Sequence, residues 1–101
     1  MKLMDIAKVI RSKNAGPRCT TLDIMFANAE DFERACSSKN LSKKSISELY
    51  GVEEGQIKEI QYPISNAIKF SIPRKVTAGD PGDKDVYGAQ QHARLFHLEI
   101  D

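Results

Sequence analysis

The stretch TTLDIMF, from Thr20 to Phe26, predicts the fold class of this chain. Its even-numbered residues Leu22, Ile24 and Phe26 are apolar. The alternate residues are Thr21, Asp23 and Met25. Successive side chains of an extended chain point to opposite faces, so this alternation predicts a strand with one buried and one solvent-facing side. Segments before and after it repeat the pattern, which makes a sheet the basis of the fold.

Three later segments also alternate between apolar and other side chains. The pattern predicts a strand in each of them, because half-buried strands have a period of two. The predicted strands are GQIKEIQYPI (55–64) with Ile60, Tyr62 and Ile64 aligned, AIKFSIP (67–73) with Ile68, Phe70 and Ile72 inward, and RLFHLEI (94–100) with Phe96, Leu98 and Ile100 on one side.

The N-terminal segment DIAKVIRSK fits two periods. Leu3, Ile6 and Ile10 match a helical stripe, whereas alternation from Ala7 onward matches a strand. We expect a strand from about Ala7, preceded by a helical turn. The NAGP that follows at 14–17 has the composition of a hairpin loop, which would connect this strand to the TTLDIMF strand.

Two short helices are predicted between the early and the late strands. Each begins at a side chain that can cap a helix and then shows an apolar stripe at helical spacing. The first is NAEDFERACSSKN, capped by Asn28, with Phe32, Ala35 and Cys36 inward; the second is LSKKSISELYG, capped by Ser42, with Ile46, Leu49 and Tyr50 inward and Gly51 as its end.

This order of elements predicts an α+β fold of two layers. Strands that alternate throughout are typical of an antiparallel sheet with one covered and one wet face. We therefore expect a mainly antiparallel sheet of four to five strands with two short helices on one face.

Bulk properties exclude several classes of protein. The 101 residues suit a single domain over 1–101, and the formal net charge of +1 argues against nucleic acid as a partner. No apolar run approaches membrane-spanning length and no signal peptide opens the sequence, so we expect no membrane association. The two cysteines form no CxxC pattern, which fits a reducing cytoplasm as the location.

The polar loop GDPGDKDVYGAQQH (79–92) is too long and too specialised for a simple linker. Its aspartates do not match the spacing of an EF-hand, and His92 and His97 fall on opposite sides of a strand. We therefore expect no metal and no cofactor. Its glycines indicate a defined backbone path, which favours a recognition loop.

A second polar stretch, RSKNAGP (11–17), directly follows the predicted first strand. Its backbone N–H groups could form an anion nest that Arg11 and Lys13 reinforce. The alternative is a plain hairpin turn with both cations in water. The sequence leaves these two interpretations open.

Several of these motifs resemble a known family. DIAKVIRSKNAGP, TLDIMF, ELYGV and GDPGDKDVYGAQQHA are similar to the bacterial family called domain of unknown function 4387, over nearly the whole chain. The resemblance implies a ferredoxin-like fold and kinship with the small C-terminal domain of acyclic terpene utilisation protein A-like proteins. It also implies a large partner of that type encoded nearby. The larger relatives have an R-S-G-D-K-G motif, of which residues 11–16 keep the Arg-Ser start and the final glycine but not the acid.

We therefore hypothesise a small subunit that docks on this large partner and completes an acid-recognising site for a carboxylate or acyl metabolite. Alternatives are a homo-oligomer that binds a small ligand on its wet sheet face, or an enzyme that uses His92 and loop aspartates, so catalysis stays undecided. The expected binding residues are Arg11, Ser12, Lys13, Asn14, Gly16, Asp80, Gly82, Asp83, Lys84, Asp85, Tyr87, Gln90, Gln91 and His92.

Overall fold

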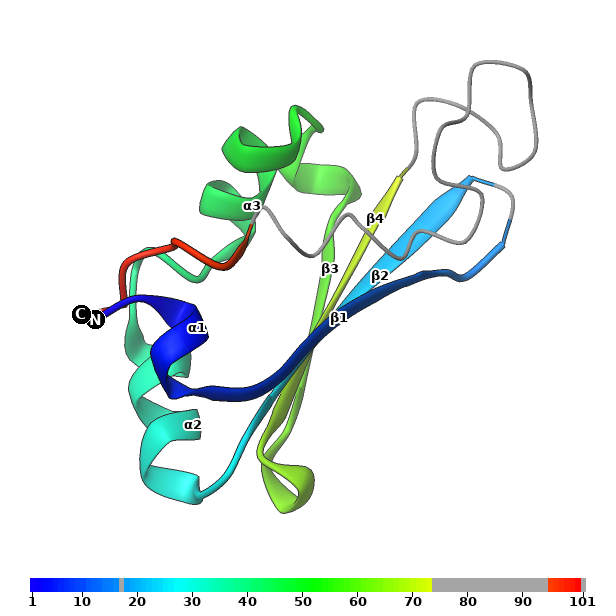
Figure 1. Ribbon diagram of the computed structural model, residues 1–101. Coiled ribbons are helices and arrows are strands. Elements are labelled where there is room, and N and C mark those ends of the chain that lie inside the picture. The colour runs from blue at the N-terminus through cyan, green and yellow to red at the C-terminus, as the bar shows by residue number, and fades with distance from the viewer. Residues whose placement is uncertain (17, 74–94, 101) are drawn as a thin grey trace.

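The structure of the chain is a computed structural model that describes residues 1–16, 18–73 and 95–100. Its centre is a four-stranded antiparallel sheet of order β1-β2-β4-β3 (Figure 1). The strands are β1 (Ala7–Asn14), β2 (Cys19–Phe26), β3 (Lys58–Tyr62) and β4 (Ala67–Pro73). The helices are α1 (Leu3–Ile6), α2 (Ala29–Ser37) and α3 (Lys43–Tyr50), with short 3-10 turns η1 (Glu54–Gln56) and η2 (Pro63–Ser65).

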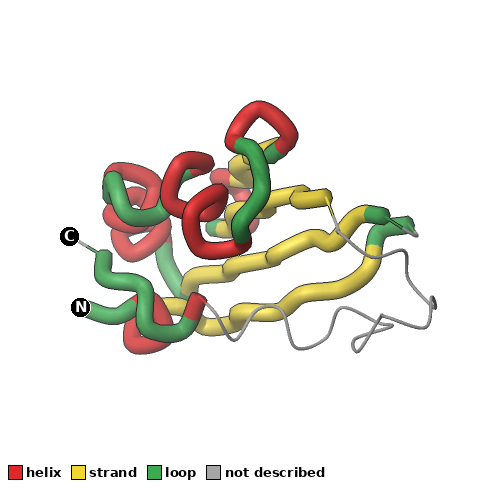
Figure 2. The backbone as a smooth tube through the Cα atoms, turned by 90° about the horizontal axis from the view of Figure 1, so that it is seen from above, coloured by secondary structure: helices red, strands yellow, loops and turns green. Residues whose placement is uncertain are grey.

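The helices gather on one side of the strands (Figures 1 and 2). Leu22 and Ile24 of β2 and Phe70 of β4 are buried beneath them, in one core with Phe32 of α2 and Ile46 of α3. The prediction of an α+β fold with helices on one face of the sheet is confirmed. Alternation identified the core face of β2 correctly, but Thr21 and Asp23 on the other face of this central strand are buried as well.

The N-terminal prediction is also confirmed. Helix α1 occupies Leu3–Ile6 and strand β1 begins at Ala7, with a bulge between Ala7 and Val9. The amide of Ala15 donates to the carbonyl of Cys19 at 2.9 Å and closes the β1–β2 hairpin.

Both predicted helix starts are found. The Asn28 side chain accepts a hydrogen bond from the amide of Asp31 at 2.8 Å, and the Ser42 hydroxyl accepts one from the amide of Ser45 at 3.3 Å. Gly51 ends α3 in the left-handed region at φ 66°, where a residue without a Cβ is favoured.

The chain order differs from the ferredoxin-like order that the resemblance implied. The described strands and longer helices follow one another as β1-β2-α2-α3-β3-β4, whereas the classic ferredoxin order is βαββαβ. The short hairpin between β1 and β2 leaves no room for the first crossover helix. Strands β2 and β3 lie on either side of β4, so α2 and α3 form the crossover between them.

The prediction of a strand over 94–100 is wrong for its described part. Residues 95–97 form a turn, and only an isolated bridge joins Glu99 to Lys2. The amide of Leu3 donates to the carbonyl of Leu98 at 2.7 Å, so the segment packs against the N-terminus instead of entering the sheet. This contact brings the two ends of the chain together (Figure 1).

The strand predicted over 55–64 is shorter than expected. Strand β3 ends at Tyr62 because Pro63 starts the η2 turn and lacks an amide for the ladder. Ile60 and Tyr62 are aligned as predicted, but they lie 42% and 41% exposed on the face away from the helices, and Ile64 is 100% exposed. An edge strand therefore carries apolar side chains outside the core.

Candidate functional site

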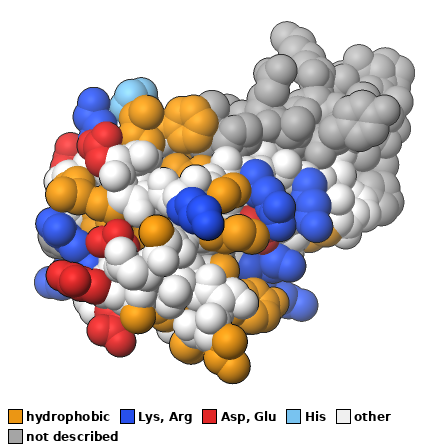
Figure 3. Space-filling view, turned by 60° about the horizontal axis from the view of Figure 1, so that its bottom comes forward, with side chains coloured by type: hydrophobic (Ala, Val, Ile, Leu, Met, Phe, Trp, Pro, Cys, Tyr) orange, Lys and Arg blue, Asp and Glu red, His pale blue; other side chains and the backbone are white. Residues whose placement is uncertain are grey.

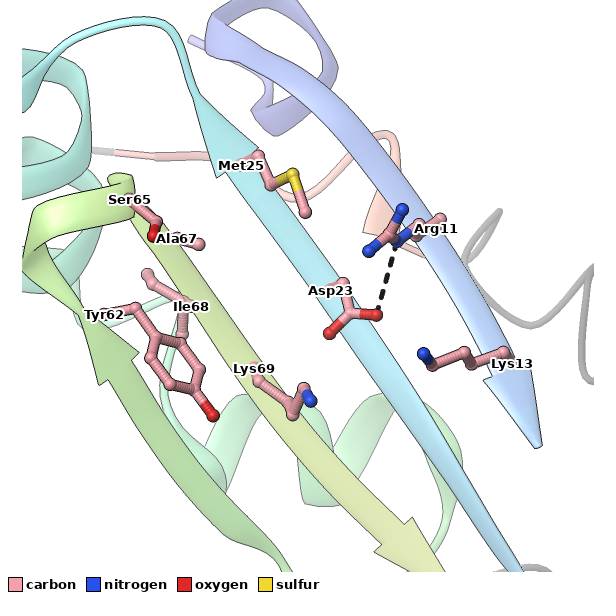
Figure 4. A pocket seen from close by; sticks show the side chains of 9 residues that line it. All are labelled: Arg11, Lys13, Asp23, Met25, Tyr62, Ser65, Ala67, Ile68 and Lys69. Atoms are coloured by element: carbon pink, nitrogen blue, oxygen red, sulfur yellow. Dashed lines mark hydrogen bonds and ion pairs between the residues drawn. The ribbon is translucent and has the colours of Figure 1, made fainter. Parts of the chain in front are cut away.

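A pocket lies on the sheet face that the helices leave open (Figure 4). Its volume is about 220 Å³. Strands β1, β2 and β4 form its floor, and β3 forms one wall. The lining residues are Arg11, Lys13, Asp23, Met25, Tyr62, Ser65, Ala67, Ile68 and Lys69.

Strand register assembles the polar part of this pocket. Arg11 of β1 lies opposite Asp23 of β2, and Asp23 lies opposite Lys69 of β4. Directly opposed residues of neighbouring strands point to the same face with their Cβ atoms about 5 Å apart. The three side chains therefore form a row of alternating charge across the sheet.

Asp23 is the buried member of this row. Its side chain is 7% exposed, whereas that of Arg11 is 55% exposed, and Arg11 Nε lies 3.4 Å from Asp23 Oδ2. Lys13 and Lys69 add two further positive charges to the lining. Three cations and one carboxylate leave the pocket with a formal charge of 3 − 1 = +2, and Figure 3 shows Lys and Arg side chains gathered on one face.

The other part of the pocket is apolar. Ala67 in the central strand β4 lies opposite Met25 on one side and Tyr62 on the other. A methyl side chain between two long ones leaves a hollow in the sheet surface. The Lys69 Nζ lies 6.0 Å from the centroid of the Tyr62 ring, so an ammonium stands where the apolar and cationic parts meet.

The structure separates the residues that sequence reasoning grouped in the first polar stretch. Arg11 and Lys13 line the pocket, but Ser12 is buried on the opposite face. Asn14 accepts a hydrogen bond from the Thr20 hydroxyl at 3.5 Å, and Gly16 stands in the hairpin turn at φ 122°.

The anion nest was one of two interpretations left open for residues 11–17, and the observed backbone gives it little support. Strand β1 continues to Asn14, so most of these amides belong to a strand and not to a turn. The two cations act as strand side chains instead. Asp23 supplies a carboxylate from across the hairpin, directly opposite Arg11.

The second predicted segment lies outside the described residues. This concerns Asp80, Gly82, Asp83, Lys84, Asp85, Tyr87, Gln90, Gln91 and His92. That these residues bind a ligand or partner together with residues of the first polar stretch stays a prediction.

Sequence reasoning missed Asp23, Met25, Tyr62 and Lys69 as site residues. It assigned Asp23 and Met25 to a wet face but gave them no chemistry. The missing signal was cross-strand register, because Lys69 becomes a neighbour of Asp23 only when β4 pairs with β2.

Thiol and metal chemistry receive little support from the described residues. Burial, followed by the nearby carboxylates of Glu59 and Glu33, raises the pKa of the Cys36 thiol above its ordinary value, which disfavours the reactive thiolate. The Cys19 Sγ lies 3.0 Å from the Ser71 Oγ. Among residues 1–16, 18–73 and 95–100, no three His, Cys, Asp or Glu side chains are grouped so that they could hold a metal ion.

A family model described as domain of unknown function (DUF4387) matches residues 3–99. The chain belongs to this family. The DUF4387 match spans every strand and helix of the fold, including all nine pocket residues. The description of this family names no reaction and gives no link to terpene utilisation. No curated protein and no solved structure matches the chain. In the part of the chain that the structure describes, no helix is long and apolar enough to cross a membrane.

Proposed function

We propose that this DUF4387 chain binds a small hydroxy acid in the pocket on its open sheet face. The observation that carries the proposal is the row Arg11–Asp23–Lys69, in which two cations flank one buried carboxylate beside an apolar hollow. A ligand carboxylate would lie against Lys69, Lys13 and the outer nitrogens of Arg11, whose guanidinium has five N–H donors.

Asp23 supports a hydroxy acid over a plain acid. An ionised carboxylate has two oxygens that accept hydrogen bonds, and Arg11 lies nearest to Oδ2. A ligand hydroxyl next to the carboxylate could donate to Asp23 while the carboxylate contacts the cations. The pocket would thereby recognise two neighbouring groups of one molecule.

Pocket size limits the ligand. At about 220 Å³ the volume lies below the roughly 300–1,000 Å³ of pockets for drug-sized ligands. Met25 and the Tyr62 ring would contact a short hydrocarbon part. The fit favours a metabolite of a few carbons over a nucleotide or a coenzyme.

A wider form of this proposal draws on the resemblance of the sequence motifs to terpene utilisation proteins, a link that the family match itself does not carry. The chain would be the small subunit of a large partner, and the Gly79–His92 segment would complete the acid site at their interface. One observation favours a shared site: Arg11 is more than half exposed, so a second surface could still close the pocket. Co-purification of the chain with the large protein that the resemblance expects to be encoded nearby tests this, and recovery of the chain alone under gentle conditions counts against it.

The binding proposal is tested by following amide shifts in NMR titrations. The probes are α-hydroxyisocaproate, lactate and the uncharged amide of lactate. We expect α-hydroxyisocaproate to bind more tightly than lactate because it can fill the apolar part, and we expect the amide not to bind. Shifts should concentrate on β1, β2 and β4.

A matched pair of variants locates the site. Lys69→Ala should weaken acid binding roughly tenfold, about the value of one charge-assisted contact. Lys8→Ala removes an exposed cation of β1 that does not line the pocket, so its affinity should equal that of the parent. Equal weakening in both variants, or equal binding of lactate and its amide, would overturn the proposal.

A further inference from the structure

The outer edge of strand β3 is the part of the fold that the acid site leaves unused. Within the described residues, β3 pairs with β4 alone and so forms one end of the sheet. The opposite edge, β1, carries a bulge between Ala7 and Val9 and the exposed Lys8, both of which discourage pairing with another strand. No bulge interrupts β3.

Exposed apolar side chains accompany this edge. Ile60 and Tyr62 lie on β3 and the fully exposed Ile64 follows in η2. The other exposed large hydrophobic side chains among the described residues, Met1 and Met4, lie at the N-terminus. A regular edge beside apolar side chains is a template for a further strand.

We propose that this edge binds a second copy of the chain, through antiparallel pairing of the two β3 strands about a twofold axis at Ile60. The sequence Lys58–Tyr62 is complementary to itself in this arrangement. Lys58 lies opposite Tyr62 of the second copy, Glu59 lies opposite Gln61, and Ile60 lies opposite Ile60.

Each of these pairs is favourable. A lysine beside a tyrosine ring repeats the contact that Lys69 already makes with Tyr62. Gln61 Nε2 already donates to Glu59 Oε2 at 3.1 Å within one chain, so the two side chains suit each other as hydrogen-bond partners. Opposed isoleucines bury apolar surface in the centre.

Neighbouring registers are less favourable. A shift toward the start of β3 sets Glu59 against Glu59, and like charges directly opposite destabilise a sheet. A shift the other way brings Pro63 into the ladder, where it has no amide to donate. Shifts by a single residue would turn the helix-covered faces of the two copies to opposite sides.

The pairing would also add a residue to the pocket. Lys58, Ile60 and Tyr62 point to the open face, so Lys58 of the second copy would stand beside Tyr62 at the pocket wall. This consequence rests on the proposed function, whereas the pairing itself does not. A single strand pair buries less than a standard interface, so we expect a dimer that dissociates on dilution.

The first test measures mass by light scattering and sedimentation over a dilution series of the full chain. The matched variants are Gln61→Glu and Gln61→Lys, which change one exposed side chain to opposite charges. By symmetry each change occurs twice, so Q61E should raise the dissociation constant of the dimer roughly fivefold or more and Q61K should not raise it. A monomer at every concentration, or equal effects of both variants, would overturn the proposal.

The second test fixes the register by disulfide formation in a background with Cys19→Ser and Cys36→Ser. Ile60→Cys places two thiols directly opposite each other at the axis, so oxidation should yield a covalent dimer. Tyr62→Cys places its thiol opposite Lys58 and should remain monomeric. Cross-linking of both variants would indicate a parallel pairing and contradict the proposed one, as would cross-linking of neither. Circular dichroism of each variant verifies that it is folded.

Discussion

Arg11 and Asp23 lie directly opposite each other on β1 and β2, with Arg11 Nε 3.4 Å from Asp23 Oδ2. The pair is asymmetric, since the arginine is largely in solvent and the aspartate is buried. An ionised carboxylate away from water requires a cation or hydrogen-bond donors nearby. Arg11 therefore supports the fold through Asp23 as well as lining the pocket.

This asymmetry predicts a stability effect. Arg11→Ala should lower the free energy of unfolding by about 1–2 kcal/mol, because Asp23 loses a charged hydrogen-bond partner. Lys8→Ala on the same strand should change it by less than about 0.5 kcal/mol. Urea unfolding followed by circular dichroism measures both, and equal effects would show that the Arg11–Asp23 pair adds no stability.

Replacement of Asp23 should distinguish binding of the ligand carboxylate by the cations from binding of the ligand hydroxyl by Asp23. Asp23→Asn removes the negative charge from the pocket, so a plain acid such as propionate should bind more tightly, by roughly threefold or more. The preference for lactate over propionate should fall, because an amide oxygen accepts a hydrogen bond less strongly than a carboxylate. NMR titration with both acids checks this. An unchanged preference would mean that Asp23 does not contact the hydroxyl.

Helix α3 depends on its two ends. Ser42→Ala removes the cap on the Ser45 amide and should cost about 1 kcal/mol of unfolding free energy. Gly51→Ala forces a side chain into the left-handed region at φ 66° and should cost about the same. Ser42→Asp should retain most of the stability in thermal unfolding, because aspartate also caps helices. A loss as large as that of Ser42→Ala would show that the cap is not the cause.

Substitution of a buried and of an exposed isoleucine should have very different effects on stability. Ile24 is buried in the core and Ile64 is fully exposed. Ile24→Ala should therefore lower the unfolding free energy by about 2–5 kcal/mol, through lost burial and a cavity. Ile64→Ala should change it by less than about 0.5 kcal/mol when measured on dilute monomer. Similar losses would mean that Ile64 is packed in solution.

The raised pKa of the Cys36 thiol predicts that the stability of the fold depends on pH. Its pKa is raised above the ordinary value of 9.0, first by burial and then by Glu59 and Glu33. The protonated thiol is therefore favoured in the folded chain, and its contribution to stability is present below pH 9.0 and lost as pH rises through the folded-state pKa.

Alkylation rates measure this shift. In a Cys19→Ser background, Cys36 should react with iodoacetamide more slowly in the folded chain than in urea, and the pH at half-maximal rate should be higher. Glu59→Gln removes one of the charges that raise the pKa and should lower that pH. An identical profile in E59Q would exclude Glu59 as a cause.

Much of the fold could be predicted from local patterns. The inward positions Leu22 and Phe70, and the caps Asn28 and Ser42, depend on residues close in sequence, and all were predicted correctly. The prediction for residues 94–100 failed because alternation there matches a strand, whereas the backbone of the described part forms hydrogen bonds with the N-terminal residues. Alternation reports which side chains share a face but not whether a neighbouring strand exists.

The candidate site was only partly predictable. Arg11 and Lys13 stood out as cations of a polar stretch, but that stretch was interpreted as a turn. Asp23 was assigned to the solvent-facing side of its strand and left without a role, whereas the structure buries it on the face away from the helices. The Gly79–His92 segment, which sequence reasoning weighted most, stays a prediction.

Residue order along the chain thus determined the alternating strands, the capped helices and the layer to which each side chain belongs. The tertiary structure decided which charges meet. Lys69 faces Asp23, and Ala67 lies between Met25 and Tyr62, only because β4 enters the sheet beside β2 in one register. Side-chain period is a local property of the backbone, whereas register is set by burial of the whole apolar face, which no single segment encodes.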